Sequence, residues 1–184
     1  MLVEVNSFPI LETNRLILRK VTNDDACSLL KYLSDRDVMK HIGLEPFKSI
    51  NDALDEISWY QSIYDKNTGI RWGITLKNQG QVIGSCGFLN LIPKHYRSEI
   101  GIELSKEHWG EGIASEAINA VIRYGFMHMN LQRIEALIEP PNLLSQKLVE
   151  KQGFIKEGLL RSYEFTGGKF DDLYMYSLLK PDFE

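Results

Sequence analysis

Apolar and polar positions alternate along several stretches of the chain, and this alternation predicts β-strands. In residues 99–104, for example, Ile, Ile and Leu alternate with Gly and Glu. The stretches 70–77 and 81–91 are separated by Asn78-Gln79-Gly80, which indicates a hairpin, and together with 99–104 they predict an antiparallel meander. Further strands are predicted at 11–20, 133–139, 154–164 and 173–179.

Between the strands, apolar residues recur every three or four positions, which is the spacing of an amphipathic helix. The clearest case runs from 112 to 129. Thr22-Asn23-Asp24-Asp25 and Ser49-Ile50-Asn51-Asp52 are capping sequences for two further helices, to about Ser34 and over 53–64. Residues 142–151 are also predicted to be helical. After a break at Asp35-Arg36-Asp37, residues 38–46 are predicted to be a short helix or a loop.

These elements indicate an α+β fold. The chain has 184 residues, a length that a single domain accounts for. Residues 99–139 follow the order strand, helix, strand, and the right-handed crossover rule predicts that strands 99–104 and 133–139 run parallel. The other strands are expected to pair antiparallel. We therefore expect a mixed, mostly antiparallel seven-stranded sheet.

Composition restricts the kind of function. The chain has 21 basic and 25 acidic residues, a net charge of −4, so a nucleic-acid partner, which needs a basic surface, is not expected. The apolar runs are too short to span a membrane. Cys27 and Cys86 are too few for a disulfide framework, and Glu4 stands where a signal peptide is basic, so a cytoplasmic location is expected. The four histidines lack ligand-like spacing, so no metal site is predicted.

A glycine-rich turn, Trp109-Gly110-Glu111-Gly112-Ile113-Ala114, joins strand 99–104 to the helix that follows. Backbone N–H groups in the first turn of a helix lack internal partners, and the helix dipole favours negative charge there. Because glycine carries no Cβ, the backbone can close around a phosphate or pyrophosphate. Neither a Walker loop nor a Gly-x-Gly-x-x-Gly fingerprint is present. A strand-to-helix connection without any ligand explains this stretch, taken alone, equally well.

Three stretches together carry a family resemblance. They are Glu99 to Leu104 with Trp109 to Ala114 and Glu116-Ala117, then Asn142 to Ser145 with Leu148, Glu150-Lys151 and Gly153-Phe154, and Thr13 to Arg19. Glu157-Gly158, Arg161 and residues 167–172 extend the match over about Leu11 to Lys180. The chain thereby resembles the GNAT superfamily of acyl-CoA-dependent N-acetyltransferases and, within it, the ribosomal-protein branch of the RimJ/RimL type. This implies one acetyltransferase domain over 11–180, with helices on both faces of the sheet and its two parallel strands splayed apart.

The resemblance implies acetyl-CoA as co-substrate and no metal. Backbone N–H groups of the turn would hold the pyrophosphate, and the edge of strand 99–104 would pair with the pantetheine amides. Asn142 would bond the same arm, although a plain helix N-cap explains it as well. Lys147 would reach a phosphate, or is simply a surface lysine. The implied binding residues are Ile102, Glu103, Leu104, Trp109, Gly110, Glu111, Gly112, Ile113, Ala114, Ser115, Asn142, Ser145 and Lys147.

Two positions depart from the family pattern. Trp109 stands where many members have Arg or Gln, so backbone donors would hold the pyrophosphate in place of a side-chain charge. Val149 stands where many members have the tyrosine that protonates the leaving thiolate. In the RimL-like branch a serine three residues after the Asn is proposed for this role, and Ser145 matches it.

The resemblance assigns the general base to Glu164, nineteen residues after Ser145. Glu103 and Glu99 compete for this role, because alternation puts both on one face of strand 99–104; Glu99 is alternatively a structural hydrogen-bonding group. A backbone N–H of the same strand would donate to the oxyanion. Cys86 is a poor nucleophile, because the sequence places no histidine to activate it.

The reaction implied by the resemblance is acetyl transfer to a primary amine by direct attack in a ternary complex. For this branch the acceptor is the N-terminal α-amino group of a (ribosomal) protein. A small-molecule amine (an antibiotic, a polyamine or an amino acid) and a non-catalytic acyl-CoA-binding module are the alternatives. A homodimer is implied by analogy. The acceptor pocket is expected from the first half of the chain, with candidate lining residues that core packing explains as well: Phe47, Trp59, Tyr60 and Trp72.

Overall fold

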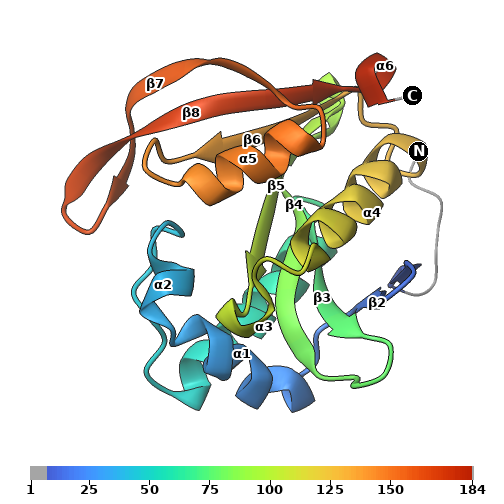
Figure 1. Cartoon of the computed structure of the whole chain (residues 1–184), viewed down its shortest axis with the longest axis vertical. Coiled ribbons are helices and arrows are strands. Elements are labelled where there is room, and N and C mark those ends of the chain that lie inside the picture. The colour runs from blue at the N-terminus through green and yellow to red at the C-terminus, as the bar shows by residue number, and fades with distance from the viewer. Residues whose placement is uncertain (1–7, 184) are drawn as a thin grey trace.

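The computed structural model describes residues 8–183, so Glu4 and the predicted lack of a signal peptide lie outside the described residues. The described residues form one eight-stranded sheet with the order β1-β2-β3-β4-β5-β6-β8-β7 (Figure 1). The strands are β1 (Leu11–Glu12), β2 (Leu16–Arg19), β3 (Ile70–Leu76), β4 (Val82–Ile92), β5 (Arg97–Leu104), β6 (Arg133–Ile138), β7 (Ile155–Thr166) and β8 (Lys169–Leu179). The helices are α1 (Ala26–Leu33), α2 (Arg36–Met39), α3 (Ile50–Asp65), α4 (Ile113–Met127), α5 (Leu143–Lys151) and α6 (Lys180–Phe183), with short 3-10 turns η1 (Asn23–Asp25), η2 (Pro93–His95) and η3 (Lys106–His108).

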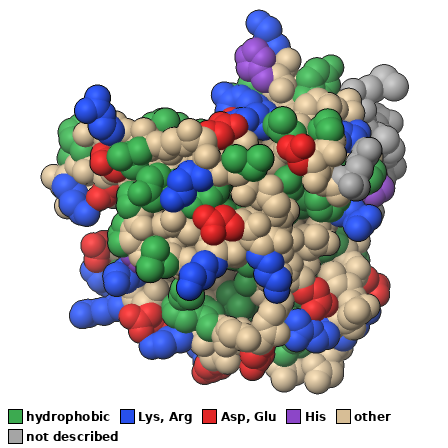
Figure 2. All heavy atoms as spheres, turned by 45° about the horizontal axis from the view of Figure 1, so that its top comes forward, with side chains coloured by type: hydrophobic (Ala, Val, Ile, Leu, Met, Phe, Trp, Pro, Cys, Tyr) green, Lys and Arg blue, Asp and Glu red, His purple; other side chains and the backbone are tan. Residues whose placement is uncertain are grey.

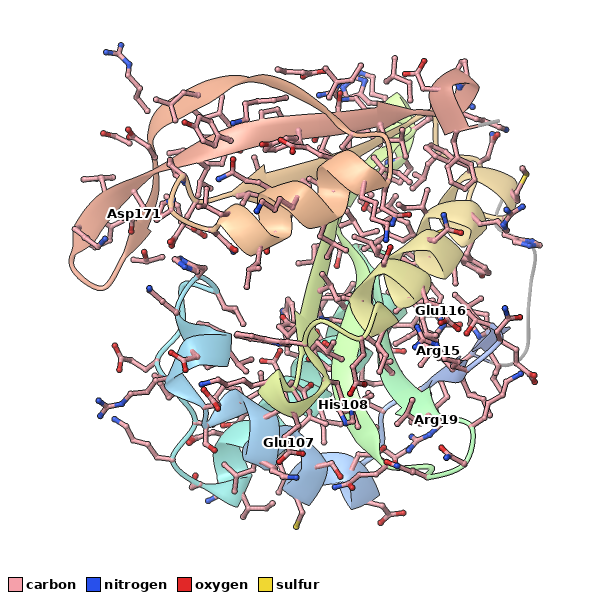
Figure 3. The ribbon with its side chains drawn as sticks, in the orientation of Figure 1. Arg15, Arg19, Glu107, His108, Glu116 and Asp171 are labelled. Carbon is pink, nitrogen blue, oxygen red and sulfur yellow. The ribbon has the colours of Figure 1, made fainter. Side chains whose placement is uncertain are left out.

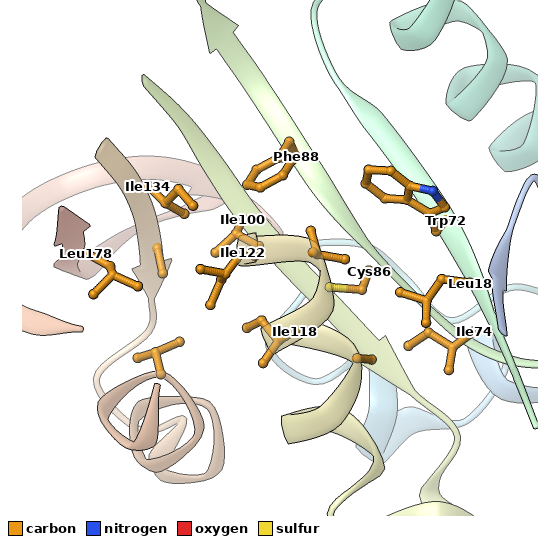
Figure 4. Close-up of a cluster of buried hydrophobic side chains, with 14 of the residues drawn as sticks. Leu18, Trp72, Ile74, Cys86, Phe88, Ile100, Ile118, Ile122, Ile134 and Leu178 are labelled. Atoms are coloured by element: carbon orange, nitrogen blue, oxygen red, sulfur yellow. The ribbon is translucent and has the colours of Figure 1, made fainter. Parts of the chain in front are cut away.

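Helices cover both faces of the sheet, and each face has its own hydrophobic cluster. The larger cluster packs α4 and α5 against the middle strands, where Trp72 and Phe88 are fully buried (Figure 4). A Cβ at Gly125 of α4 would lie 2.5 Å from the Phe88 ring, so α4 can approach β4 this closely only at a glycine. The smaller cluster packs α1 and α3 together, around Leu29 and Ile57.

The sheet has one strand more than the seven predicted, because the stretch 11–20 forms two short strands. The backbone N–H of Thr13 donates to Leu16 O (3.0 Å), which turns the chain so that β1 pairs antiparallel with β2. The predicted antiparallel meander of β3, β4 and β5 is confirmed. The last strand begins at Lys169 and not at 173 as predicted, because its first residues are largely exposed and lack apolar alternation.

Polar side chains start the helices where the sequence predicted caps. The Asp52 carboxylate accepts from the backbone N–H of Ser49 (2.9 Å) at the start of α3, and Asp25 accepts from Thr22 (2.9 Å) before α1. The predicted break after Ser34 is confirmed, but the next helix begins earlier than predicted. The Asp35 side chain accepts from Asp37 N–H (2.7 Å) and thereby caps α2.

Strands β5 and β6 run parallel, as the crossover through α4 predicted. They pair from Arg97↔Arg133 to Glu99↔Glu135. Beyond this point residues 8–183 contain no further pairing between them, although β5 continues to Leu104 and β6 to Ile138. The two strands therefore separate, which confirms the predicted splay. We call the gap beyond the Glu99–Glu135 pair the β5–β6 opening.

Candidate active site

The turn between β5 and α4 depends on the backbone of two glycines. Gly110 has φ +80° and Gly112 has φ +77°, in the left-handed region that other residues avoid. A Cβ at Gly110 would meet no atom within 4 Å, so its requirement comes from the backbone angle and not from crowding. Gly112 is also the N-cap of α4. The two glycines therefore turn the chain from the end of β5 into the start of α4.

This turn leaves several backbone donors free. The first backbone hydrogen bond of α4 runs from Glu116 N to Gly112 O (3.1 Å), so the N–H groups of Ile113, Ala114 and Ser115 precede the helical ladder. The positive end of the helix dipole lies at the same place. Unpaired amides at a helix N-terminus form a binding site for an anionic group, and a pyrophosphate fits the predicted role.

The structure explains why residues Thr13 to Arg19 belong to the pattern that resembles the family. Glu116, in the first turn of α4, accepts from the Thr13 hydroxyl (2.5 Å), from Arg15 N–H (2.9 Å) and from Arg15 Nε (2.7 Å). Arg15 Nη1 also donates to the backbone carbonyl of Glu111 (2.9 Å). Figure 3 shows Arg15 and Glu116 side by side. The β1–β2 turn thus clamps both the glycine turn and the start of α4.

Trp109 holds the other end of the turn. Its indole Nε1 donates to the backbone carbonyl of Leu104 (2.8 Å), and 38% of the residue is exposed. Next to it, His108 Nδ1 lies 3.4 Å from the Glu111 carboxylate. The aromatic residue therefore anchors the turn to the end of β5, where many family members have a charged or amide side chain.

On one side of the β5–β6 opening, the edge of β5 that faces β6 is free. Residues Ile102 to Leu104 pair with β4 and, in the described chain, have no partner on β6. Across the opening, Asn142 caps α5, and its Oδ1 accepts from Ser145 N–H (3.1 Å). The N-cap explanation of Asn142 is thus correct, and its side-chain amide N–H groups are left for another partner. These are the parts that a peptide-like pantetheine arm would need.

The remaining predicted residues of α5 have different surroundings. Ser145 is half-buried in the first turn of the helix, and Lys147 is exposed. Val149, at the position of the usual tyrosine, is 4% exposed and belongs to the larger hydrophobic cluster. The tyrosine position is therefore filled by a core residue in this chain.

Glu103, predicted as a candidate base, lies in a buried ion pair. Its carboxylate pairs with the Arg71 guanidinium, and the Ser85 hydroxyl donates to it (2.6 Å). Arg71 Nε donates to the same Ser85 oxygen (2.9 Å), and Tyr60 Oη lies 3.1 Å from it. Burial alone would lower the pKa of the Arg71 guanidinium. The neighbouring Glu103 carboxylate outweighs burial and raises this pKa above its ordinary value. Nearby, the Tyr32 hydroxyl is buried without a partner in the described structure.

Glu99 lies at the closed end of the β5–β6 opening, as the last residue of β5 that pairs with β6. Burial raises the pKa of its carboxyl, and the nearby charges of Glu135 and Glu164 act in the same direction. On α3, burial also raises the pKa of Glu56, with Glu103 acting in the same direction.

Alternation puts Glu99 and Glu103 on the face opposite Ile100, which packs towards α4. We call this face of the opening the acceptor face.

Glu164, the base implied by the resemblance, is exposed on β7. A Cβ at Gly43, in the segment between α2 and α3, would lie 3.9 and 4.0 Å from its two carboxylate oxygens. In the same segment His41 Nδ1 lies 2.6 Å from Glu139 Oε2, directly after β6. Sequence reasoning missed this pair, because the two residues are 98 positions apart and nothing local links them.

The aromatic residues predicted to line the acceptor pocket are mostly core residues. Trp72 is fully buried, and its indole donates to Pro9 O (2.8 Å). Tyr60 is 5% exposed, and Phe47 packs against the smaller cluster. Trp59 is 42% exposed and therefore is the member of this set that remains open to a ligand.

Cys86, which the sequence predicts to be a poor nucleophile, is fully buried. Burial raises the pKa of Cys86 to about 12, which opposes a thiolate nucleophile. Residues 8–183 contain no group of three or more metal-ligating side chains, and none of their helices is long and apolar enough to cross a bilayer. On the face that Figure 2 shows, Lys and Arg are interspersed with Asp and Glu, so that face has no continuous basic surface.

Comparisons with known proteins agree with this geometry. The family model described as "Acetyltransferase (GNAT) domain" matches residues 15–155. The uncharacterized N-acetyltransferase YoaA of Bacillus subtilis (strain 168) is 44% identical over 174 residues, which cover 95% of this chain and 98% of that protein. The ribosomal protein uS5-alanine N-acetyltransferase of Escherichia coli (strain K12) is 25% identical over 181 residues, covering 94% and 91%.

Among solved structures, the spermidine N-acetyltransferase of Vibrio cholerae, in complex with CoA and spermine, superimposes with a TM-score of 0.79. It is 26% identical, and the match covers 93% of this chain and 99% of that chain. The family model spans well over half of the chain, and the similarity to YoaA extends over nearly all of it. The chain therefore belongs to the GNAT family of acetyltransferases and is an N-acetyltransferase.

Proposed function

We propose that the protein transfers the acetyl group of acetyl-CoA directly to a primary amine, with both substrates bound at the β5–β6 opening. The observation that carries this proposal is the position of the free amides of Ile113, Ala114 and Ser115, next to the unpaired edge of β5. An anion site at a helix N-terminus would hold the pyrophosphate, and the adjacent strand edge would pair with the pantetheine amides.

The residues on each side of the opening have distinct roles in this proposal. The turn from Trp109 to Ser115 binds the pyrophosphate, and Ile102 to Leu104 bind the pantetheine through their backbone. Asn142 offers its side-chain N–H groups to the same arm, because its oxygen already caps α5. Lys147 is exposed on the same helix and is a candidate for a phosphate contact. Glu103 contributes its backbone, since Arg71 and Ser85 occupy its carboxylate.

The reaction needs a proton acceptor, because an amine attacks a thioester only in its unprotonated form. The nitrogen lone pair forms a bond to the carbonyl carbon, a backbone N–H of β5 donates to the oxyanion, and the C–S bond then breaks. The thiolate leaves as CoA and takes up one proton. Glu164 as base and Ser145 as acid remain the assignments that the RimL-type resemblance supports.

Two acceptors have specific support. The N-terminal α-amino group of a (ribosomal) protein is supported by the RimJ/RimL resemblance and by the uS5-alanine acetyltransferase relative. A polyamine is supported by Glu56, Glu99 and Glu164, whose carboxylates form no ion pair with a Lys or Arg side chain of residues 8–183, and by the spermidine acetyltransferase neighbour. Clustered carboxylates on the acceptor face favour a substrate with more than one positive charge.

The decisive experiment measures thiol release from acetyl-CoA with a panel of acceptors: short peptides with free N-termini, including that of uS5, then spermidine, amino acids and an aminoglycoside. Turnover with peptides alone supports the first acceptor, and turnover with spermidine alone supports the second. Saturable acetyl-CoA binding without turnover of any amine would contradict the proposed reaction and favour a binding module.

Glu164→Gln tests the predicted base. We expect a lower rate at neutral pH and a smaller effect at high pH, where more of the amine is already unprotonated. Asp65→Asn, at the exposed end of α3, is the matched control and should leave the rate unchanged. An unchanged rate for Glu164→Gln at every pH would remove Glu164 as the base. The predicted homodimer is tested separately, by light scattering coupled to size exclusion.

A further inference from the structure

The His41–Glu139 pair joins two parts of the chain at the acceptor face. Glu139 follows the last residue of β6, and His41 lies just after α2. The two side chains are 18% and 20% exposed, and their 2.6 Å contact is short enough to fix the ring. Because an ionised carboxylate only accepts hydrogen bonds, Nδ1 carries the proton that Glu139 accepts. In the neutral ring the lone pair is therefore on Nε2, the usual arrangement of a base held by an orienting carboxylate.

The pair lies where the two substrates would meet. Glu139 is four residues beyond Glu135, so it lies about 13 Å along the β6 wall from the closed end of the opening. Because residues an even number of positions apart point to the same face of a strand, Glu139 continues the face of Glu135, which is the acceptor face. Three residues further, Asn142 is the N-cap of α5. On the other side, Glu164 lies next to Gly43, two positions from His41.

We propose that His41, oriented by Glu139, is a proton acceptor for the amine substrate and works beside Glu164. This inference rests on the proposed function. The ammonium group gives one proton to His41 Nε2, and the freed nitrogen lone pair attacks the thioester carbonyl carbon. When the C–S bond breaks, the second proton of the nitrogen passes to the thiolate through the Ser145 hydroxyl, the acid of the proposed function. His41 then returns its proton to water, so the net products are the acetamide, CoA thiol and one proton.

The charges around His41 fit this role. Glu139 faces the ring from the end of β6, and Glu164 lies nearby on β7. Lys169, at the start of β8, pairs with Asp171 (2.6 Å) and also feels the charge of Glu139. Asp171, on the β7–β8 hairpin (Figure 3), accepts from the Thr166 hydroxyl (2.7 Å), and a Cβ at Gly43 would lie 3.1 Å from that threonine side chain. Because Lys169 balances Asp171, the carboxylates that attract an ammonium substrate towards the imidazole are those of Glu139 and Glu164.

The test compares His41→Gln with the control His95→Asn, an exposed histidine of η2 outside the site. A positioned base contributes roughly 100-fold to the rate, so we expect His41→Gln to lower kcat about 100-fold. The KM for acetyl-CoA should stay within about twofold. The dependence of kcat/KM on pH should differ in shape from that of wild type, because one proton acceptor has been removed. His41→Ala should regain activity when free imidazole is added.

Glu139→Gln is the second variant, because it keeps the imidazole and removes only its orienting charge. We expect it to lower kcat by about tenfold and to shift the pH profile. A purely structural role would instead lower the melting temperature and leave the pH profile and the imidazole response as in wild type. That result, or a kcat of His41→Gln within twofold of wild type, would overturn the inference. If wild type turns over no amine, the proposed function fails first and this inference fails with it.

Discussion

The two sides of the β5–β6 opening are built in different ways. The turn that we propose for the CoA side consists of consecutive residues, and its free donors are the backbone N–H groups of Ile113, Ala114 and Ser115. The acceptor face consists of side chains brought together from α3, β5, β7 and the ends of α2 and β6. A backbone site needs only the correct local conformation, whereas a side-chain site needs the whole fold. The first can therefore be recognised in the sequence, and the second cannot.

The charged side chains on the two sides of the opening also differ in what they contact. On the CoA side, Glu116 receives three hydrogen bonds from the β1–β2 turn and serves to hold the backbone in place. On the acceptor face, Arg71 balances Glu103, while burial raises the pKa of Glu56 and of Glu99. Carboxylates with raised pKa in an open site are available for a cationic ligand or a proton. The carboxylate of the first region thus holds the backbone in place, whereas Glu56 and Glu99 of the second region are the groups that we propose for acceptor binding.

The largest effect should come from removing Arg71 of the acceptor face. Arg71→Met leaves the Glu103 carboxylate, which is 13% exposed, without its partner. Breaking a buried ion pair from one side typically costs about 3–5 kcal/mol, so we expect the free energy of unfolding to fall by about that amount. Urea unfolding followed by circular dichroism measures it.

The double variant Arg71→Met/Glu103→Met provides the control, since it removes both charges. It should recover most of the stability, because no unpaired charge remains. Lys31→Met, which breaks a pair whose side chains are 59% and 64% exposed, should cause no measurable loss. A loss below about 1 kcal/mol for Arg71→Met would mean that water reaches Glu103, and the contrast between the two regions would weaken.

The next largest effect is on acetyl-CoA binding, and it tests whether the backbone conformation of the turn at Gly110 is required. Gly110→Val should weaken acetyl-CoA binding about 100-fold, because valine cannot adopt φ +80° without displacing the amides of the turn. Gly80→Val is matched, since Gly80 has φ +68° and equally open surroundings but lies in the β3–β4 turn. Calorimetric titration should show normal binding for Gly80→Val. Equal affinities for both variants would show that this backbone does not bind the pyrophosphate.

The features that could be predicted from the sequence are those that depend on neighbouring residues or on chain handedness. The Ser49–Asp52 cap, the two glycines and the parallel β5–β6 pair each follow from neighbouring residues or from chain handedness. The sequence did not predict the division of 11–20 into two strands, because the partner that holds the Thr13 turn is Glu116, more than 100 residues away. The His41–Glu139 contact was missed for the same reason. The role of Thr13 and Arg15 as a clamp became evident only from the fold.

A smaller effect is expected from this clamp. Glu116→Gln keeps the size of the side chain but removes the charge that Arg15 and Thr13 address. Charge-assisted hydrogen bonds contribute about 1.5–3 kcal/mol when buried, and Arg15 is 48% exposed, so we expect a loss of about 1–2 kcal/mol. Thermal unfolding measures the loss. Glu107→Gln, whose partner Lys31 is exposed, should unfold like wild type, and an identical curve for Glu116→Gln would contradict the clamp.

The smallest effect concerns the closed end of the opening, where Arg133 joins β6 to β7. Hydrogen bonds from Arg133 lower the pKa of Glu157 to about 2 from its ordinary value of 4.5. A carboxyl with a lowered folded-state pKa stabilises the fold above pH 4.5 and loses this contribution as the pH falls towards 2. Since the side chain is 42% exposed, solvent screens the pair and we expect about 1 kcal/mol or less.

Glu157→Gln should therefore be less stable than wild type at pH 6, and the difference should shrink steadily below pH 4. Urea unfolding at several pH values measures both variants, and Glu107→Gln again provides an exposed carboxylate as control. A difference in the free energy of unfolding between Glu157→Gln and wild type that stays constant down to pH 2 would show that packing, and not the ion pair, causes the loss. In that case the charges at the closed end would contribute little, and the difference between the two regions would be confined to the open part of the acceptor face.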